Sequence, residues 1–294
     1  MRGVACRTIR RMFTTLIQAP ELRALLDTGP PVLVMDCSFD LTKPDAGRQQ
    51  FEAAHVPGAV YVHLDTDLSD KTRPASEGRH PLPSPAVFAA RMAALGVGHH
   101  TQVVVMDRQG INFCGRLWWM LRWCGHEAVA VLDGGLQAWM AAGGALQGGP
   151  AAARAPGDFS ARPPLTTALD TAAVATRLRQ GDLTVIDARA APRFRGEVEP
   201  LDPVAGHIPG ALNRPFTENL QADGRFKPAG VLRAEFERLL GGRDAAQVVH
   251  QCGSGVSAVP NLLAMEVAGL GRAALYPGSW SAWCNTEGMP CARG

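Results

Sequence analysis

The chain has 294 residues, of which 46% are hydrophobic and 19% are charged, and its formal net charge is +2. This length allows two domains of ordinary size, and the small net charge gives no reason to expect binding to nucleic acid or to a membrane. No apolar run approaches the roughly 18 residues that a membrane-spanning helix needs. The seven cysteines form no Cys-x-x-Cys pair, which argues against a disulfide framework or a structural zinc site and favours a reducing compartment.

The first eleven residues are basic, contain no acidic residue and lack the apolar core of a secretory signal. We expect residues 1–15 to form a tail outside the folded domains, and Met12 is a candidate natural start. The expected location is the cytoplasm. A short transit peptide is the alternative, and it would direct the protein to an organelle matrix.

Apolar runs and helical periodicity alternate along the rest of the chain. In the first half they predict strands at 31–35, 103–106 and 128–132 and helices at 85–95, 113–123 and 136–142, the helix at 113–123 being amphipathic. In the second half they predict helices at 169–180 and 232–240, strands at 183–187, up to 251 and at 273–276, a helix after Cys252 and a terminal helix. Residues 143–166, rich in Gly, Ala and Pro, are expected to link domains at 16–142 and 167–294. The alternation predicts α/β domains, each with a mainly parallel sheet covered by helices on both faces.

Cys252 follows an apolar strand and opens the loop Cys252-Gly-Ser-Gly-Val-Ser257, which runs into a helix. Backbone N–H groups and the positive end of the helix dipole gather in such a loop and favour a thiolate. Gly253 and Gly255 allow the backbone to approach a ligand closely. The loop therefore predicts a nucleophilic cysteine in an anion-binding cradle. A buried cysteine that only packs is the alternative interpretation.

Several motifs recur after about 150 residues. Val34-Met-Asp36 matches Val185-Ile-Asp187, and His55-Val-Pro-Gly-Ala59 matches His207-Ile-Pro-Gly-Ala211. The segment from Leu132 to Trp139 is echoed by the segment from Tyr276 to Trp283. In this alignment Asp107 of the first copy stands where the second copy has Cys252. The repeat predicts duplicated domains, of which only the second is equipped for thiol chemistry.

Together these motifs, with Arg193-Phe-Arg-Gly196, make the chain from about Leu16 onward resemble the two-domain rhodanese-type sulfurtransferases. The resemblance implies two tandem rhodanese-like domains, an inactive first one and a catalytic second one. The cysteine loop resembles that of 3-mercaptopyruvate sulfurtransferases, with Ser257 where threonine is usual. It lacks the basic residues that follow the cysteine in thiosulfate-specific members. However, the mercaptopyruvate enzymes often carry a second arginine after a Glu-Pro pair, where this chain has Leu201.

The resemblance also implies a reaction in two halves. Cys252 would take sulfur from 3-mercaptopyruvate, release pyruvate and hold the sulfur as a persulfide. The acceptor would be cyanide, a small thiol or a thioredoxin-like protein, and we expect no metal, organic cofactor, nucleic acid or membrane partner. The thiolate and the persulfide would be stabilised by the loop N–H groups, from Gly253 and Ser254 through Gly255 and Val256 to Ser257.

Arg193 is the candidate for binding the donor's carboxylate, because a guanidinium matches a carboxylate as a bidentate fork. Arg195 is its possible substitute, and a surface role is the alternative for Arg193. Ser254 is a candidate to pass a proton to the departing enolate, or otherwise caps the helix.

His55 matches a family histidine proposed to face the active cleft, with Asp45 as a candidate to orient it. The alternative for His55 is a structural role in its turn, because His207 recurs in the same motif. Three tryptophans and two cysteines are expected in the core: Trp118, Trp119, Trp123, Cys114 and Cys124.

Three other functions compete with this one. A thiosulfate:cyanide sulfurtransferase would use the same cysteine with a different donor. A cysteine phosphatase needs an arginine six positions after its cysteine, where this chain has Ala258. A non-catalytic rhodanese module for protein binding or sulfur relay is the third possibility, and the presence of Cys252 argues against it.

Overall fold

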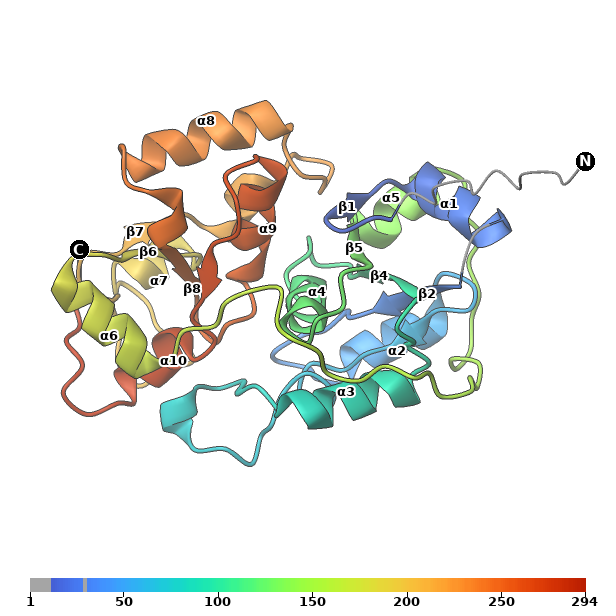
Figure 1. The fold of residues 1–294 in the computed structure, drawn as a ribbon, viewed down its shortest axis with the longest axis horizontal. Helices are drawn as coiled ribbons and strands as arrows, with labels where there is room; N and C mark the ends of the chain where they lie inside the picture. Colours follow the sequence, from blue (N-terminus) through green and yellow to red (C-terminus); the bar gives the residue numbers. More distant parts are fainter. Residues whose placement is uncertain (1–11, 29–30) are drawn as a thin grey trace, which may run out of the picture.

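The structure of the chain is a computed structural model that describes residues 12–28 and 31–294. The basic tail up to residue 11 lies outside the described residues. Figure 1 shows two lobes, each built on a sheet with helices packed against it. Phe13 is buried, its N–H donates to Gln102, and Trp118 donates to the carbonyl of Thr14. The folded part therefore includes residue 13, before the boundary expected at residue 16.

The first domain contains a five-stranded parallel sheet in the order β1-β5-β4-β2-β3. Its strands are β1 (Leu16–Ile17), β2 (Val32–Asp36), β3 (Val60–Tyr61), β4 (Gln102–Met106) and β5 (Val129–Leu132). Its helices are α1 (Ala19–Thr28), α2 (Ala46–Ala53), α3 (Pro85–Ala94), α4 (Cys114–Trp123) and α5 (Gly135–Ala141), with a 3₁₀ turn η1 (Ala75–Glu77). Alternate residues of β4 enter different cores, so both faces of the sheet are covered.

The second domain repeats this plan with a four-stranded parallel sheet in the order β7-β6-β8-β9. Its strands are β6 (Thr184–Asp187), β7 (Leu212–Asn213), β8 (Val248–Gln251) and β9 (Ala274–Leu275). Its helices are α6 (Thr171–Gln180), α7 (Ala191–Phe194), α8 (Ala229–Leu240), α9 (Val259–Val267) and α10 (Ser279–Cys284), with 3₁₀ turns η2 (Phe216–Asn219) and η3 (Ala245–Gln247). Helices α8 and α9 cover one face, and α6 and α10 cover the other.

Each element predicted from the sequence is present within a few residues of its expected ends. Helices α1, α2 and α7 and the two-residue strands β1, β3 and β7 were not predicted from the sequence. Strands this short show no periodicity, and α2 is a mostly polar helix whose only large buried side chain is Phe51.

Helix α4 differs from its prediction. It is not amphipathic, because every residue from Cys114 to Arg122 is buried. One side packs on β4 and β5, and the other meets α9 of the second domain. Trp118 and Trp119 are fully buried, as are Cys114 and Cys124, which confirms these residues as core; Trp123 is partly buried.

The two domains share one continuous hydrophobic core through this helix pair. Arg122 of α4 forms an ion pair with Glu266 across the interface at 2.8 Å. The segment around η1 leaves the first domain and packs against α10 of the second, as Figure 1 shows below α10. This excursion positions first-domain side chains at the second-domain loop. No helix in residues 12–28 and 31–294 is long and apolar enough to cross a bilayer.

Candidate active site

Cys252 lies directly after β8, and the loop that it opens leads into α9. Its thiol is buried, and its side chain is only 2% exposed. Gly255 has a φ of +71°, and a Cβ at that position would lie 2.3 Å from the carbonyl oxygen of Pro277. Only glycine fits there, so the close approach of these two backbone segments fixes the curl of the loop.

The turn before α10 supports the loop from the other side. The Oγ of Ser279 accepts the N–H of Cys252 at 3.1 Å, and the N–H of Trp280 donates to the Cys252 carbonyl at 3.0 Å. Ser279 has a φ of +54°, an uncommon value for a residue other than glycine. Its hydroxyl holds the backbone of Cys252, and this contact accounts for the strained backbone conformation at Ser279.

The backbone N–H groups of residues 253–258 have no hydrogen-bond acceptor within the described residues. They precede α9, where the helix dipole adds partial positive charge. Unpaired N–H groups of this kind form a binding site for an anion.

Arg116 of α4 brings a buried positive charge to this loop from the first domain. Its guanidinium donates to the carbonyl oxygens of Gly255, Leu68 and His80. Burial lowers the pKa of Arg116 to about 10, so the group stays charged near neutral pH. No carboxylate pairs with it in the part of the chain that the structure describes. Arg116 thus joins the two domains and places a positive charge at the cysteine loop.

Ser254 is the first member of a chain of polar side chains. Nδ1 of His80 lies 2.7 Å from its Oγ, and Nε2 of the same ring lies 3.4 Å from Oδ1 of Asp65. Burial lowers the pKa of His80 to about 4, so the imidazole is neutral near neutral pH. Contact with His80 in turn lowers the pKa of Asp65 to about 2, and Lys71 adds to this effect. In the tautomer that carries its proton on Nε2, next to the carboxylate, Nδ1 is free to accept the serine proton.

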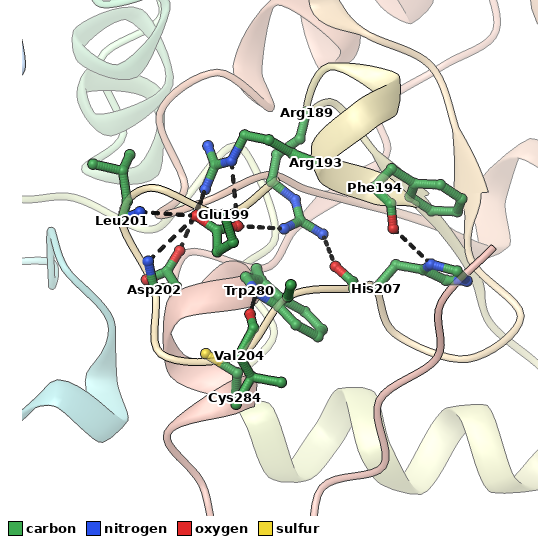
Figure 2. Close-up of polar contacts among 12 residues, drawn as sticks. Arg189, Arg193, Phe194, Glu199, Leu201, Asp202, Val204, His207, Trp280 and Cys284 are labelled. Carbon is green, nitrogen blue, oxygen red and sulfur yellow. Dashed lines mark hydrogen bonds and ion pairs between the residues drawn. The ribbon is translucent and has the colours of Figure 1, made fainter. Parts of the chain in front are cut away.

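A second cluster of charges lies beside the loop. Glu199 accepts from both Arg189 and Arg193, and Figure 2 shows its carboxylate between the two guanidinium groups. Arg189 also forms an ion pair with Asp187 at the end of β6. Asp202 completes the cluster by approaching Arg193 at 3.5 Å. The arginines are therefore held in fixed orientations by buried carboxylates.

A cavity of about 160 Å³ lies between these groups and the cysteine loop. Both domains line it, through Arg79, His80 and Phe113 from the first and Arg193, Ser254 and Ser257 from the second. It is smaller than the pockets that hold drug-sized ligands. A small anion with few heavy atoms is the kind of ligand that matches its size and its N–H lining.

Several candidates from the sequence meet at this cavity: Arg193, Gly253, Ser254, Val256 and Ser257 line it, and Gly255 shapes the loop. Arg195 does not, because it is exposed and pairs with Glu197. Arg193 is at the cavity but is not free, since Glu199 holds one edge of its guanidinium.

His55, which was expected to face the active cleft, is not among the residues that line the cavity. Its ring stacks on Phe51 at 3.9 Å, and its Nδ1 bonds to the Phe51 carbonyl at 2.7 Å. His207 repeats this arrangement with Phe194. Asp45 is exposed, and no hydrogen bond or ion pair joins it to His55 within the described residues. These contacts favour the structural role, which was the alternative for His55.

Four first-domain residues at the site were not predicted from the sequence: Asp65, Arg79, His80 and Arg116. One signal was available. The segment between His55 and Asp107 is longer than its counterpart between His207 and Cys252, and this longer segment contains Arg79 and His80.

Comparisons with known proteins identify the family of the chain. The family model of the rhodanese-like domain matches residues 18–142 and 170–286. The chain belongs to the rhodanese family. The predicted fold class, two tandem rhodanese-like α/β domains, is confirmed by this match and by the two parallel sheets.

Close relatives carry sulfurtransferase names. A probable 3-mercaptopyruvate sulfurtransferase of Pseudomonas aeruginosa is 46% identical over 280 residues, which is 95% of this chain and 98% of the relative. A putative thiosulfate sulfurtransferase, SseB of Mycobacterium tuberculosis, is 40% identical over 279 residues, covering 95% and 97% of the two chains. The crystal structure of SseA from Escherichia coli, described among 3-mercaptopyruvate sulfotransferases, has a TM-score of 0.77 and 33% identity over 90% of this chain and 98% of SseA. The expected enzyme class, a sulfurtransferase, is confirmed.

Proposed function

We propose that the protein transfers a sulfur atom from 3-mercaptopyruvate, through a persulfide on Cys252, to a thiol or to cyanide. The observation that carries this proposal is the meeting of two groups at one small cavity: the unpaired N–H groups of residues 253–258 and the Ser254–His80–Asp65 chain. The first is suited to an anionic sulfur, and the second is suited to moving a proton.

In the first half-reaction the Cys252 thiolate attacks the sulfur of the donor. An S–S bond forms, the donor's C–S bond breaks, and its electron pair leaves with carbon as the enolate of pyruvate. The donor's thiol proton must reach that carbon for pyruvate and a persulfide anion to result. Ser254 and His80 provide a relay for this proton, because the neutral Nδ1 of His80 can take the serine proton and return it.

In the second half-reaction the acceptor's nucleophile attacks the outer sulfur of the persulfide, and Cys252 leaves as the thiolate again. A small thiol or a thioredoxin-like protein is the acceptor that we propose, in the cytoplasm. The six cysteines of the described residues are all free, as expected in a reducing compartment.

Thiosulfate is the second candidate donor, and the name of the Mycobacterium tuberculosis relative favours it. The charges beside the loop favour 3-mercaptopyruvate, a monoanion, over thiosulfate, a dianion. Asp187, Glu199 and Asp202 pair with the three arginines beside the cavity, and His80 is neutral. Arg116 is then the one cation at the loop that has no carboxylate partner among the described residues, and a single surplus charge suits a monoanion better than a dianion. The ratio of kcat/KM for the two donors, with cyanide as the shared acceptor, decides between them.

Mass spectrometry after incubation with 3-mercaptopyruvate and no acceptor tests the mechanism. We expect a mass gain of one sulfur atom on the peptide that contains Cys252, reversed by added cyanide. Cys252→Ser should lose the adduct, whereas the matched variant Cys291→Ser, at an exposed cysteine, should keep it. Turnover by Cys252→Ser, or an adduct confined to another cysteine, would contradict the proposal.

A further inference from the structure

Arg79, on the first-domain segment that follows η1, presents unused hydrogen-bond donors to the cavity. Its Nη1 donates to Oδ1 of Asp202 at 2.5 Å. Its Nε is buried without a partner, and no acceptor for its Nη2 exists among the residues that the structure describes. A guanidinium held by one edge and open at the other is ready to receive an anionic ligand.

Arg193 is arranged in the same way. Its Nε and Nη2 are engaged by Glu199, and Nη2 also approaches Asp202, whereas no acceptor in the described ranges takes its Nη1. Figure 2 shows this guanidinium directed at the Glu199 and Asp202 carboxylates. Asp202 is therefore shared by the two arginines and ties them together.

The open edges of the two arginines meet at Gly253, the residue next to the nucleophile. A Cβ built on Gly253 would lie 2.9 Å from Nη2 of Arg79 and 3.5 Å from Nη1 of Arg193. Both side chains line the cavity of about 160 Å³. Leu201 lines the same cavity and has no hydrogen-bonding side chain to offer.

We propose that Arg79 binds the donor's carboxylate together with Arg193 and thereby selects α-keto acid donors. The inference rests on the proposed function and deepens it. Two guanidinium edges fixed by a shared carboxylate give a planar carboxylate several charge-assisted hydrogen bonds at little entropic cost. Because Arg79 comes from the first domain, the donor site is complete only when the two domains are docked.

The test compares two donors that differ only in the carboxylate: 3-mercaptopyruvate and mercaptoacetone, the same mercaptoketone without it. In Arg79→Ala we expect kcat/KM for 3-mercaptopyruvate to fall about ten- to hundredfold, mainly through KM, as for the loss of a hydrogen bond to a charged group. Turnover of mercaptoacetone should be unchanged. Arg73→Ala, an exposed arginine of the same segment paired with Glu77, is the matched control and should leave both donors unaffected.

Two further variants separate binding from structure. Arg79→Lys keeps a positive charge near Asp202 but lacks the second N–H edge, so it should still lose 3-mercaptopyruvate selectively. Leu201→Arg in the Arg79→Ala background restores a guanidinium to the cavity and should recover part of the loss.

Equal losses with both donors, or no loss with either, would overturn the role of Arg79 in an enzyme that otherwise uses 3-mercaptopyruvate. A wild-type enzyme that turns over thiosulfate but not 3-mercaptopyruvate would instead refute the proposed function, and this inference with it. The wild-type donor comparison therefore distinguishes the two failures.

Discussion

The two domains contain the same strand–loop–helix turn, but one loop is occupied by its own side chain and the other is open. After β4, the Asp107 carboxylate accepts four backbone N–H groups at 2.8–2.9 Å, from Gln109, Ile111, Phe113 and Cys114. After β8, the corresponding residue is Cys252, and the N–H groups of residues 253–258 have no acceptor in the described part of the chain. The same arrangement of backbone N–H groups thus contributes to stability in one domain and to anion binding in the other.

The backbone of the two loops is similar where the chain turns. Gly110 and Gly255, each three residues after the aspartate or the cysteine, have φ values of +68° and +71°. The difference lies in the side chain at the start of the loop. A carboxylate reaches the N–H groups and satisfies them, whereas a thiol leaves them for an incoming ligand. The cradle of the first domain is filled by Asp107, and this domain contributes Arg79, His80 and Arg116 to the site of the second.

The largest expected effect comes from making the second loop like the first. In Cys252→Asp the new carboxylate should fill the cradle, abolish sulfur transfer and leave the protein at least as resistant to urea as the wild type. Cys291→Asp, at an exposed cysteine, is the control and should keep full activity. Steady-state kinetics and urea unfolding measure both properties. A strongly destabilised variant would show that the two loops are not equivalent as anion cradles.

The second prediction concerns the first-domain relay. His80→Gln removes the base that accepts the Ser254 proton, so kcat should fall about a hundredfold or more, within the usual range for a general acid–base group. The KM for the donor should change little, because Arg79 and Arg193 remain. His99→Gln, at a histidine outside the cavity, is the control. An unchanged kcat would exclude His80 from proton transfer.

The third prediction concerns removal of the Asp107 carboxylate, which fills the loop after β4. Asp107→Ala leaves three buried N–H groups and one part-buried N–H group without their acceptor, and each buried donor that loses its partner costs about 1–3 kcal/mol. The free energy of unfolding should fall by about 3 kcal/mol or more, as measured by urea denaturation. Activity per folded molecule should be retained, because Asp107 does not line the cavity near Cys252. A large loss of kcat in the folded variant would contradict a purely structural role for this carboxylate.

The cysteine loop and the duplication were predictable because both are recognised from short motifs whose residues are close together in the sequence. The strand, the loop glycines and the following helix are adjacent in sequence, and the repeat aligned Asp107 with Cys252. Arg193 was also found, since a family motif surrounds it.

The relay and the second arginine could not be predicted this way. His80 and Ser254 are 174 positions apart, and they meet only because the η1 segment packs against α10. No local motif encodes such a contact between domains. His55 attracted attention because it lies in a motif, but its recurrence as His207 was the sign of a structural role. Both rings stack on a phenylalanine at 3.9 Å.

The smallest expected effect is the pH dependence of stability that the first-domain relay gives to the protein. Burial lowers the pKa of His80 to about 4, below the value of about 6.5 for an unfolded histidine. The unfolded chain therefore binds the proton more readily than the folded one. This contribution is constant above about pH 6.5 and is lost as the pH falls from there to about 4, by up to about 3 kcal/mol.

His250 acts in the same direction, because burial lowers its pKa to about 3. The contribution of His80 to the pH dependence of stability is measured by comparing the wild type with His80→Gln. Urea unfolding of both proteins is followed at about pH 7 and about pH 4.5. The wild type should lose more stability between the two pH values than the variant, since only the wild type has a histidine at position 80 to protonate on unfolding. Equal losses would mean that His80 is not protected from protonation in the folded protein. The contact between the Arg79-His80 segment and the cysteine loop would then be looser than the 2.7 Å hydrogen bond to Ser254 implies.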